Sequence, residues 1–179
     1  MTVLLRFSHW VDEMNRGFGW VASWLILLAC LISAGNATSR YLFSLSSNAW
    51  LEVQWYMFAG MFLLGASYTL RMNGHVRVDI VYANVSHRRR LWIDTLGLIL
   101  FLMPAMVMLA WMSWPYFLDS WTRMEHSSNA GGLLRWPVKL LMPVGFTLIS
   151  LQGISELIKR VAALTGRLDF DTGYERPLQ

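Results

Sequence analysis

Four histidines are the side chains best suited to hold haem or a metal ion in this chain: His9, His75, His87 and His126. In a membrane anchor, haem is held by axial ligands that project from within the helix bundle. All four histidines lie outside the long uncharged stretches of the sequence, although His75 lies near the end of one. A haem- or quinone-binding membrane anchor of a redox complex therefore stays open only as an alternative interpretation.

Catalytic signatures are missing from the sequence. It contains no glycine-rich phosphate loop, no His-Glu-x-x-His zinc motif and no Ser–His–Asp set with a recognisable spacing. The single cysteine, Cys30, excludes an internal disulfide and a cysteine-based metal cluster. Cys30 also lies deep in an apolar stretch, where a reactive thiolate is costly. We predict that the protein is not an enzyme and has no catalytic residues, metal or cofactor.

The composition predicts a membrane protein. Of 179 residues, 55% are hydrophobic and 15% are charged, with ten tryptophans, whereas soluble domains have about a quarter of charged residues. A soluble protein of this size would lack the polar residues to cover its surface. The net charge of +4 does not require a nucleic-acid partner, because basic residues also mark the cytoplasmic side of membrane proteins.

Four long stretches without charged residues predict four membrane-spanning helices. About 20 helical residues cross a hydrocarbon core of about 30 Å. The first three uncharged stretches, 17–39, 53–70 and 95–118, are predicted spans as they stand. The fourth, 140–155, is short, and extending it back to Pro137, a favourable first helical residue, gives the predicted span 137–158 with Lys139 and Glu156 near its ends. The expected fold is an all-α, integral membrane four-helix protein with short interfacial amphipathic helices. Residues 1–165 form a single transmembrane domain, and 166–179 form a polar cytoplasmic tail.

The distribution of basic residues predicts the orientation. Placing both termini and the second loop in the cytoplasm puts eleven Lys and Arg residues inside and four outside. An excess of basic residues on the cytoplasmic side decides topology. We therefore expect a multi-pass protein with both termini cytoplasmic.

Two segments outside the spans are amphipathic. In 3–14 and again in 78–85, apolar residues recur at helical spacing, and the second segment precedes the basic run 88–90. Both patterns suit helices in the headgroup plane, with the basic run near anionic lipid. A short helix packed on another subunit is an equally good interpretation.

The spans lack the residues that a self-sufficient transporter needs. Such proteins carry an ionisable side chain inside a span, whereas Glu52 and Glu156 lie only at span edges. This argues against the second alternative, a small exporter that works as an oligomer. Small residues such as Ala29 and Gly60 favour close helix packing, within the chain or with a partner helix.

The ordered motifs of the chain resemble a known family. The stretch 36–52 has the pattern N-x-x-x-R-Y-x-F-x-x-S-x-x-x-W-x-E, and 74–79 is G-H-V-R-V-D. The run 127–137, S-S-N-A-G-G-L-L-R-W-P, follows later. Over residues 5–165 the sequence resembles the small membrane subunit, the Q-type small permease component, of tripartite ATP-independent periplasmic transporters. Members often have two adjacent acidic residues after the loop tryptophan, whereas Val53 follows Glu52 here.

The resemblance implies a non-catalytic subunit of a secondary-active importer in the bacterial inner membrane. A periplasmic solute-binding protein captures the solute, often a carboxylate, and a large transmembrane permease subunit moves it inward with a sodium or proton gradient. The small subunit scaffolds the large one and helps to dock the binding protein. The implied partners are therefore these two proteins and membrane lipid, with no nucleic acid.

Ten residues are candidates for a partner interface or a structural motif. Arg40 and Glu52 flank the first outer loop, where they pair with each other or with a partner. A second group, at the inner turn after the second span, is expected to cap that helix or to contact the large subunit; it consists of Arg71, His75, Arg77 and Asp79. The loop 119–136 is the expected contact with the binding protein, and Gly131 and Gly132 would let it adjust. The full set is Arg40, Trp50, Glu52, Arg71, His75, Arg77, Asp79, Arg123, Arg135 and Trp136.

Overall fold

The computed structural model describes residues 2–45, 47–75 and 85–168. Its helices are α1 (Thr2–Phe43), α2 (Asn48–Arg71), α4 (His87–Gly97), α5 (Met103–Thr122) and α6 (Trp136–Leu164). A π-helical turn, η1 (Leu98–Leu102), joins α4 to α5 without a break. The described residues contain no named strand, so the all-α prediction is confirmed.

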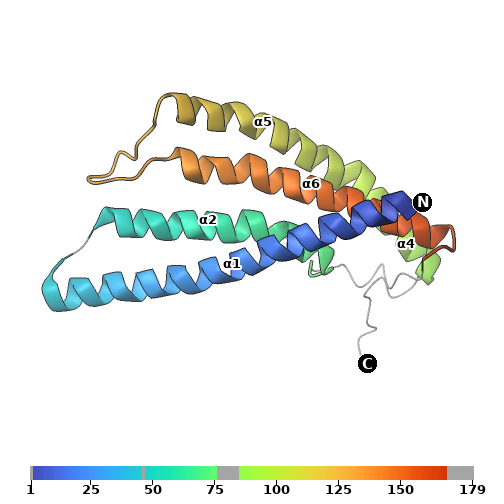
Figure 1. The fold of residues 1–179 in the computed structure, drawn as a ribbon, viewed down its shortest axis with the longest axis horizontal. Coiled ribbons are helices and arrows are strands. Elements are labelled where there is room, and N and C mark those ends of the chain that lie inside the picture. The colour runs from blue at the N-terminus through green and yellow to red at the C-terminus, as the bar shows by residue number, and fades with distance from the viewer. Residues whose placement is uncertain (1, 46, 76–84, 169–179) are drawn as a thin grey trace.

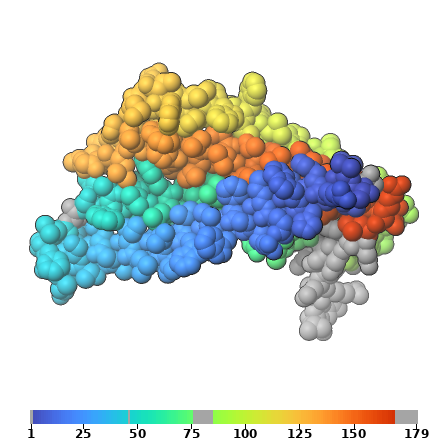
Figure 2. All heavy atoms as spheres, in the orientation of Figure 1, coloured from blue at the N-terminus to red at the C-terminus, as the bar shows by residue number. Residues whose placement is uncertain are grey.

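The helices form a flat, elongated bundle. α5, α6, α2 and α1 follow one another across the molecule, and the first half of α1 crosses onto α6 (Figure 1). The α1–α2 and α5–α6 connections lie together at one end, which we call the hairpin end (Figure 1). The N-terminus lies at the other end, which we call the network end after the polar side chains, such as Asn15 and Gln152, that are hydrogen-bonded there. The space-filling view shows the same elongated form, with α1 along one side and α5 along the other (Figure 2).

Three helices of the described part are long and apolar enough to cross a membrane: Thr2–Phe43, the continuous His87–Thr122 and Trp136–Leu164. The predicted span 53–70 lies in α2, which has 24 residues and packs between α1 and α6. It is less apolar than the others because polar residues such as Gln54 and Ser67 face the bundle interior.

The amphipathic segment 3–14 is helical, but it is not a separate interfacial helix. α1 runs unbroken from Thr2 to Phe43, a length of about 63 Å at about 1.5 Å per residue. The face that packs on α6 carries Ser8, Val11 and Asn15, whereas Trp10 is 59% exposed. Of the apolar residues at helical spacing, Val3, Leu4 and Trp10 face outward and Val11 faces α6, because lipid accepts large apolar side chains whereas the polar ones pair inside. The segment 78–85 lies almost wholly outside the described residues.

Close helix contacts depend on glycine at a few positions. A Cβ on Gly145 of α6 would lie 2.8 Å from Leu63 Cβ and 2.9 Å from its carbonyl oxygen. A Cβ on Gly60 of α2 would lie 2.8 Å from a methyl carbon of Leu25. Because α2 touches both neighbours through these positions, its packing sets the spacing of the central helices.

Candidate functional site

At the hairpin end, one carboxylate of α2 holds the α5–α6 connection. Residues 123–135 form a compact loop, the outer hairpin, with an antiparallel bridge between His126 and Leu134. Glu52 accepts hydrogen bonds from the Ser127 hydroxyl, from Asn129 Nδ2 at 2.8 Å and from the Leu133 amide at 2.7 Å. The residue is only 4% exposed. Its carboxylate therefore fixes the hairpin to the start of α2.

Further bonds make the hairpin rigid. The Asn48 side chain and the Tyr56 hydroxyl of α2 donate to the carbonyls of Ala130 and Leu134, at 3.3 and 2.9 Å. A Cβ on Gly132 would lie 2.5 Å from Ser127 Cβ, and Gly131 has φ +68°. Both glycines are needed for the tight turn, which gives them a structural role that differs from the expected freedom to adjust.

An ion-pair group lies behind the hairpin. Glu125 pairs with Lys139 of α6 at 2.5 Å and with Arg135 at 3.6 Å. The Lys139 ammonium also lies 4.0 Å from the ring centroid of Tyr116 on α5. Trp136, which begins α6, packs edge-on against Trp121, with the ring centroids 4.5 Å apart. These contacts join α5, α6 and the hairpin into one unit.

The two hairpin carboxylates are stabilised in their ionised form. The Leu133 amide, followed by the Ser127 hydroxyl, holds the pKa of Glu52 below its ordinary value of 4.5. The hydrogen bond from Lys139 likewise lowers the pKa of Glu125. A hydrogen bond to a carboxylate favours its charged form. Both acids are therefore charged at neutral pH, where the hairpin is held most firmly.

Two other predicted residues of the hairpin end, Arg123 and Arg40, are exposed. Arg123 pairs with Asp119 at 2.8 Å on the surface of α5, with 75% of its side chain exposed. Arg40 lies exposed at the end of α1 and makes no ion pair within the described residues. Glu52 thus binds the hairpin, whereas Arg40 does not pair with it.

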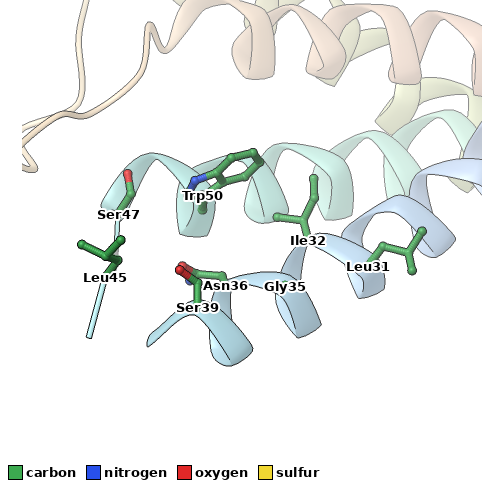
Figure 3. Close-up of a pocket in the computed structure, with 8 residues that line it drawn as sticks. All are labelled: Leu31, Ile32, Gly35, Asn36, Ser39, Leu45, Ser47 and Trp50. Atoms are coloured by element: carbon green, nitrogen blue, oxygen red, sulfur yellow. The ribbon is translucent and has the colours of Figure 1, made fainter. Parts of the chain in front are cut away.

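Trp50, on the first turn of α2, lines a groove between α1 and α2 of about 580 Å³. Leu31, Asn36 and Ser39 come from α1 and face Ser47 and Trp50 at the start of α2 (Figure 3). Trp50 is 53% exposed. The groove is mostly apolar and opens where the two helices end, so it adds no charged group to the hairpin end.

At the network end of α2, Arg71 is the last helical residue, and its guanidinium lies 6.0 Å from the Tyr68 ring. His75 lines a groove between α1 and α2 of about 450 Å³. Arg77 and Asp79 lie outside the described residues. Of the four residues of the expected cluster, the structure therefore describes only Arg71 and His75.

A buried polar network at the network end was not predicted from the sequence. Gln152 of α6 accepts from Asn15 Nδ2 at 2.7 Å and donates to Asp12 at 2.8 Å and to Glu156 at 3.1 Å. Gln152 and Asn15 are fully buried. One amide thus bridges α1 to α6 through three side chains.

Charged residues complete this buried network. Lys159 pairs with both Asp12 at 3.1 Å and Glu156, and Arg160 pairs with Glu156 at 2.5 Å and with Asp94 of α4 at 3.7 Å. Glu156 and Arg160 are 1% and 3% exposed. We call the set Ser8, Asp12, Asn15, Asp94, Gln152, Ser155, Glu156, Lys159 and Arg160 the buried network. It ties α1, α4 and α6 together.

A signal for the buried network was present in the sequence. Ser8, Asp12 and Asn15 recur at helical spacing, as do Gln152 and Glu156. Each set alone suggests a solvated face, because a single helix does not show which partner will cover it. Only the crossing of α1 over α6 turns both polar stripes inward.

The four histidines lie in different parts of the structure. His9 and His87 are exposed near the network end, His75 lies just after α2, and His126 in the hairpin contacts the Met124 carbonyl at 2.8 Å. In the described part of the chain, no three His, Cys, Asp or Glu side chains are grouped as metal ligands.

Comparison with protein families gives a match over most of the chain. A family model described as tripartite ATP-independent periplasmic transporters, DctQ component, matches residues 29–163. No curated protein gives a significant match, and neither does any solved structure. The matched region includes the outer hairpin, Glu52 and the α6 side of the buried network.

Proposed function

The chain belongs to the DctQ-component family of tripartite ATP-independent periplasmic transporters, and from this we propose that it scaffolds the large permease subunit and docks the periplasmic solute-binding protein. It is a multi-pass membrane protein and a transporter component. The solute that we propose for the whole importer is a carboxylate-type molecule, and the membrane is the bacterial inner membrane. The small subunit itself catalyses no reaction.

The observation that carries the scaffold role is the poor burial of the apolar helices. Only 17% of the most apolar stretch of α1 is buried, and 11% of that of the α4–α5 helix, against 44% of that of α6. α5 packs on α6 alone among the long helices. A flat bundle of this kind offers wide apolar faces to lipid or to partner helices, and a fixed membrane partner uses such a surface well.

The position of the charges supports a non-transporting subunit. The buried acids at both ends already have partners: Glu52 binds the hairpin, and Glu156 binds Arg160 and Lys159. A transport site needs an ionisable group available to cargo within the membrane. Among the described residues, these acids are engaged in holding helices and loops together.

Docking of the binding protein is assigned to the outer hairpin. Its backbone shape is set by Glu52 and by Gly131 and Gly132, whereas Arg123 and Arg135 remain 75% and 42% exposed. A preformed surface pays little ordering entropy on binding, and rim charges mainly steer association. With both termini in the cytoplasm, this end faces the periplasm.

A pull-down tests the scaffold role. The full chain, tagged after Gln179, is purified from its native membranes in mild detergent, and the co-purifying proteins are identified by mass spectrometry. We expect a stoichiometric large permease subunit. Recovery of the chain alone would contradict the scaffold role, and recovery with a flavin or iron–sulfur subunit would support the redox-anchor alternative instead.

Charge reversal tests the docking role. We expect Arg123→Glu with Arg135→Glu to slow association of the binding protein with the assembled membrane complex, measured by surface plasmon resonance at low salt, and to reduce solute uptake. Arg16→Glu is the matched control, because Arg16 is an exposed arginine in a short-range surface ion pair at the opposite end. Equal association rates for all variants would refute the docking role and leave the scaffold role standing.

No observation in the described part of the chain favours the redox anchor or the self-sufficient exporter. The histidines nearest the network end, His9 and His87, are exposed on different helices. Glu52 and Glu156, the acids at the span edges, are held by internal partners.

A further inference from the structure

A basic cavity lies at the network end, outside the buried network. It has a volume of about 510 Å³ and lies between the first turn of α4 and the residues that follow α6. Leu91, Ala163 and Leu164 line its apolar part, and His87 and Arg88 line its polar part. None of its lining residues is acidic. The cavity therefore combines an apolar wall with a positively charged edge.

Three arginines that make no ion pair within the described residues line this basic cavity or adjoin its lining residues in the sequence. Arg88 lines it, Arg89 follows on the same turn, and Arg167 stands between two lining residues, Gly166 and Leu168. All three arginines are exposed, and none makes an ion pair within the described residues. Elsewhere the exposed Arg16 and Arg123 pair with nearby carboxylates. The three free guanidiniums thus concentrate positive charge where no acid of the described chain balances it.

The membrane interface passes close to the same place. Trp92 lies one helical turn after Arg88 and is 51% exposed, and exposed tryptophans favour the headgroup region. α4 continues from there through η1 into α5 as an apolar helix long enough to span a bilayer. A ligand in the basic cavity is therefore at headgroup depth. The apolar wall of the cavity then lies closer to the membrane centre than its positively charged edge.

We propose that this basic cavity binds the phosphate headgroup of an anionic phospholipid. The phosphate lies between the Arg88 and Arg167 guanidiniums, which suit bidentate contacts with its oxygens. The glycerol and the first acyl carbons lie against Leu91 and Leu164. The complementary charge selects an anionic lipid over a zwitterionic one, because no lining acid is present to accept the cationic headgroup of a zwitterionic lipid.

Lipid titration by native mass spectrometry tests the proposal on the purified full chain. Phosphatidylglycerol and phosphatidylcholine with the same acyl chains are the two probes, and inorganic phosphate is the third. We expect phosphatidylglycerol to bind more tightly than phosphatidylcholine. Each of Arg88→Gln and Arg167→Gln should weaken phosphatidylglycerol binding about five-fold, corresponding to about 1 kcal/mol per basic residue near a lipid surface.

Two further variants make the test specific. Arg6→Gln removes the same charge from another exposed arginine of the same end and should leave binding unchanged. Ala163→Trp fills the cavity while keeping every charge, and should abolish the preference for phosphatidylglycerol. Equal weakening by Arg6→Gln would show a diffuse basic surface, and an unaffected Ala163→Trp would place the lipid elsewhere. Displacement of the lipid by equimolar inorganic phosphate would show a free-phosphate site. Each of these results would overturn the proposal without bearing on partner docking.

Discussion

Replacing Glu156 by glutamine should loosen the attachment of α1 to α6. The Glu156 side chain is almost completely buried, and it accepts hydrogen bonds or ion pairs from Gln152, Lys159 and Arg160. Glutamine keeps the shape of the side chain but removes the negative charge. Two cations then share the remaining carboxylates of the buried network.

The size of the effect follows from the contacts that remain. Breaking a buried ion pair by removing one partner costs about 3–5 kcal/mol. Here Arg160 keeps Asp94 at 3.7 Å, and Lys159 keeps Asp12 at 3.1 Å, which offsets part of the loss. We therefore expect the free energy of unfolding to fall by about 2–3 kcal/mol, at or just below the lower end of the range for a broken buried pair.

Equilibrium unfolding in mixed micelles, followed by circular dichroism, measures this change. Hydrogen exchange of the amides of Ser8–Asn15 should also become faster, because Asp12 and Asn15 of α1 are held by Gln152 and Lys159, both of which also contact Glu156. Glu13→Gln is the control: Glu13 is 38% exposed in a surface pair with Arg16, and such pairs contribute about 0.2–1 kcal/mol. The reasoning is refuted if the two variants lose equal stability, or if exchange in α1 does not change in Glu156→Gln.

Two other predictions concern the hairpin and the helix spacing. Because hydrogen bonds lower the pKa of Glu52, the bonds to the hairpin are fully present above the ordinary carboxyl pKa of 4.5 and are lost as the pH falls through the lower folded value. The Leu133 amide should therefore be protected from hydrogen exchange at neutral pH and lose this protection in acid. In Glu52→Gln the amide should be less protected already at neutral pH. Equal protection in that variant at neutral pH would contradict the role of Glu52 in holding the hairpin. Gly145→Ala places a Cβ against the Leu63 backbone, so overpacking of about 1–3 kcal/mol should exceed the helix-propensity gain of about 1 kcal/mol. Gly97→Ala, with no neighbour within 4 Å, should show that gain alone, and a thermal shift of the same sign in both variants would contradict the expected close approach of α2 and α6.

The sequence determined the membrane character and the helix positions of this protein. Long uncharged apolar stretches are typical of helices that cross a membrane, and each predicted span lies within a continuous helical segment of the structure. The family resemblance was also visible, because its motifs are local runs, and the family match confirmed it.

The polar contacts could not be read in the same way. Glu52 lies at a span edge, and the sequence offered Arg40 as its partner, whereas the folded chain brings Ser127, Asn129 and Leu133 to it from 75 or more residues away. Such a pairing depends on how α2 and α6 lie together, which no local pattern encodes.

Only the tertiary structure decided which helix face is inside. The apolar residues of 3–14 recur at helical spacing, and this amphipathic pattern predicted a helix in the headgroup plane with its apolar face turned away from water. In a membrane protein, lipid accepts side chains such as Trp10, and the chain instead buries Ser8 and Asn15, with Asp12 half-buried beside them, against the polar stripe of α6. Burying such polar groups without hydrogen-bond partners costs free energy. Their pairing, rather than hydrophobicity, is therefore the interaction that selects the arrangement of α1 on α6.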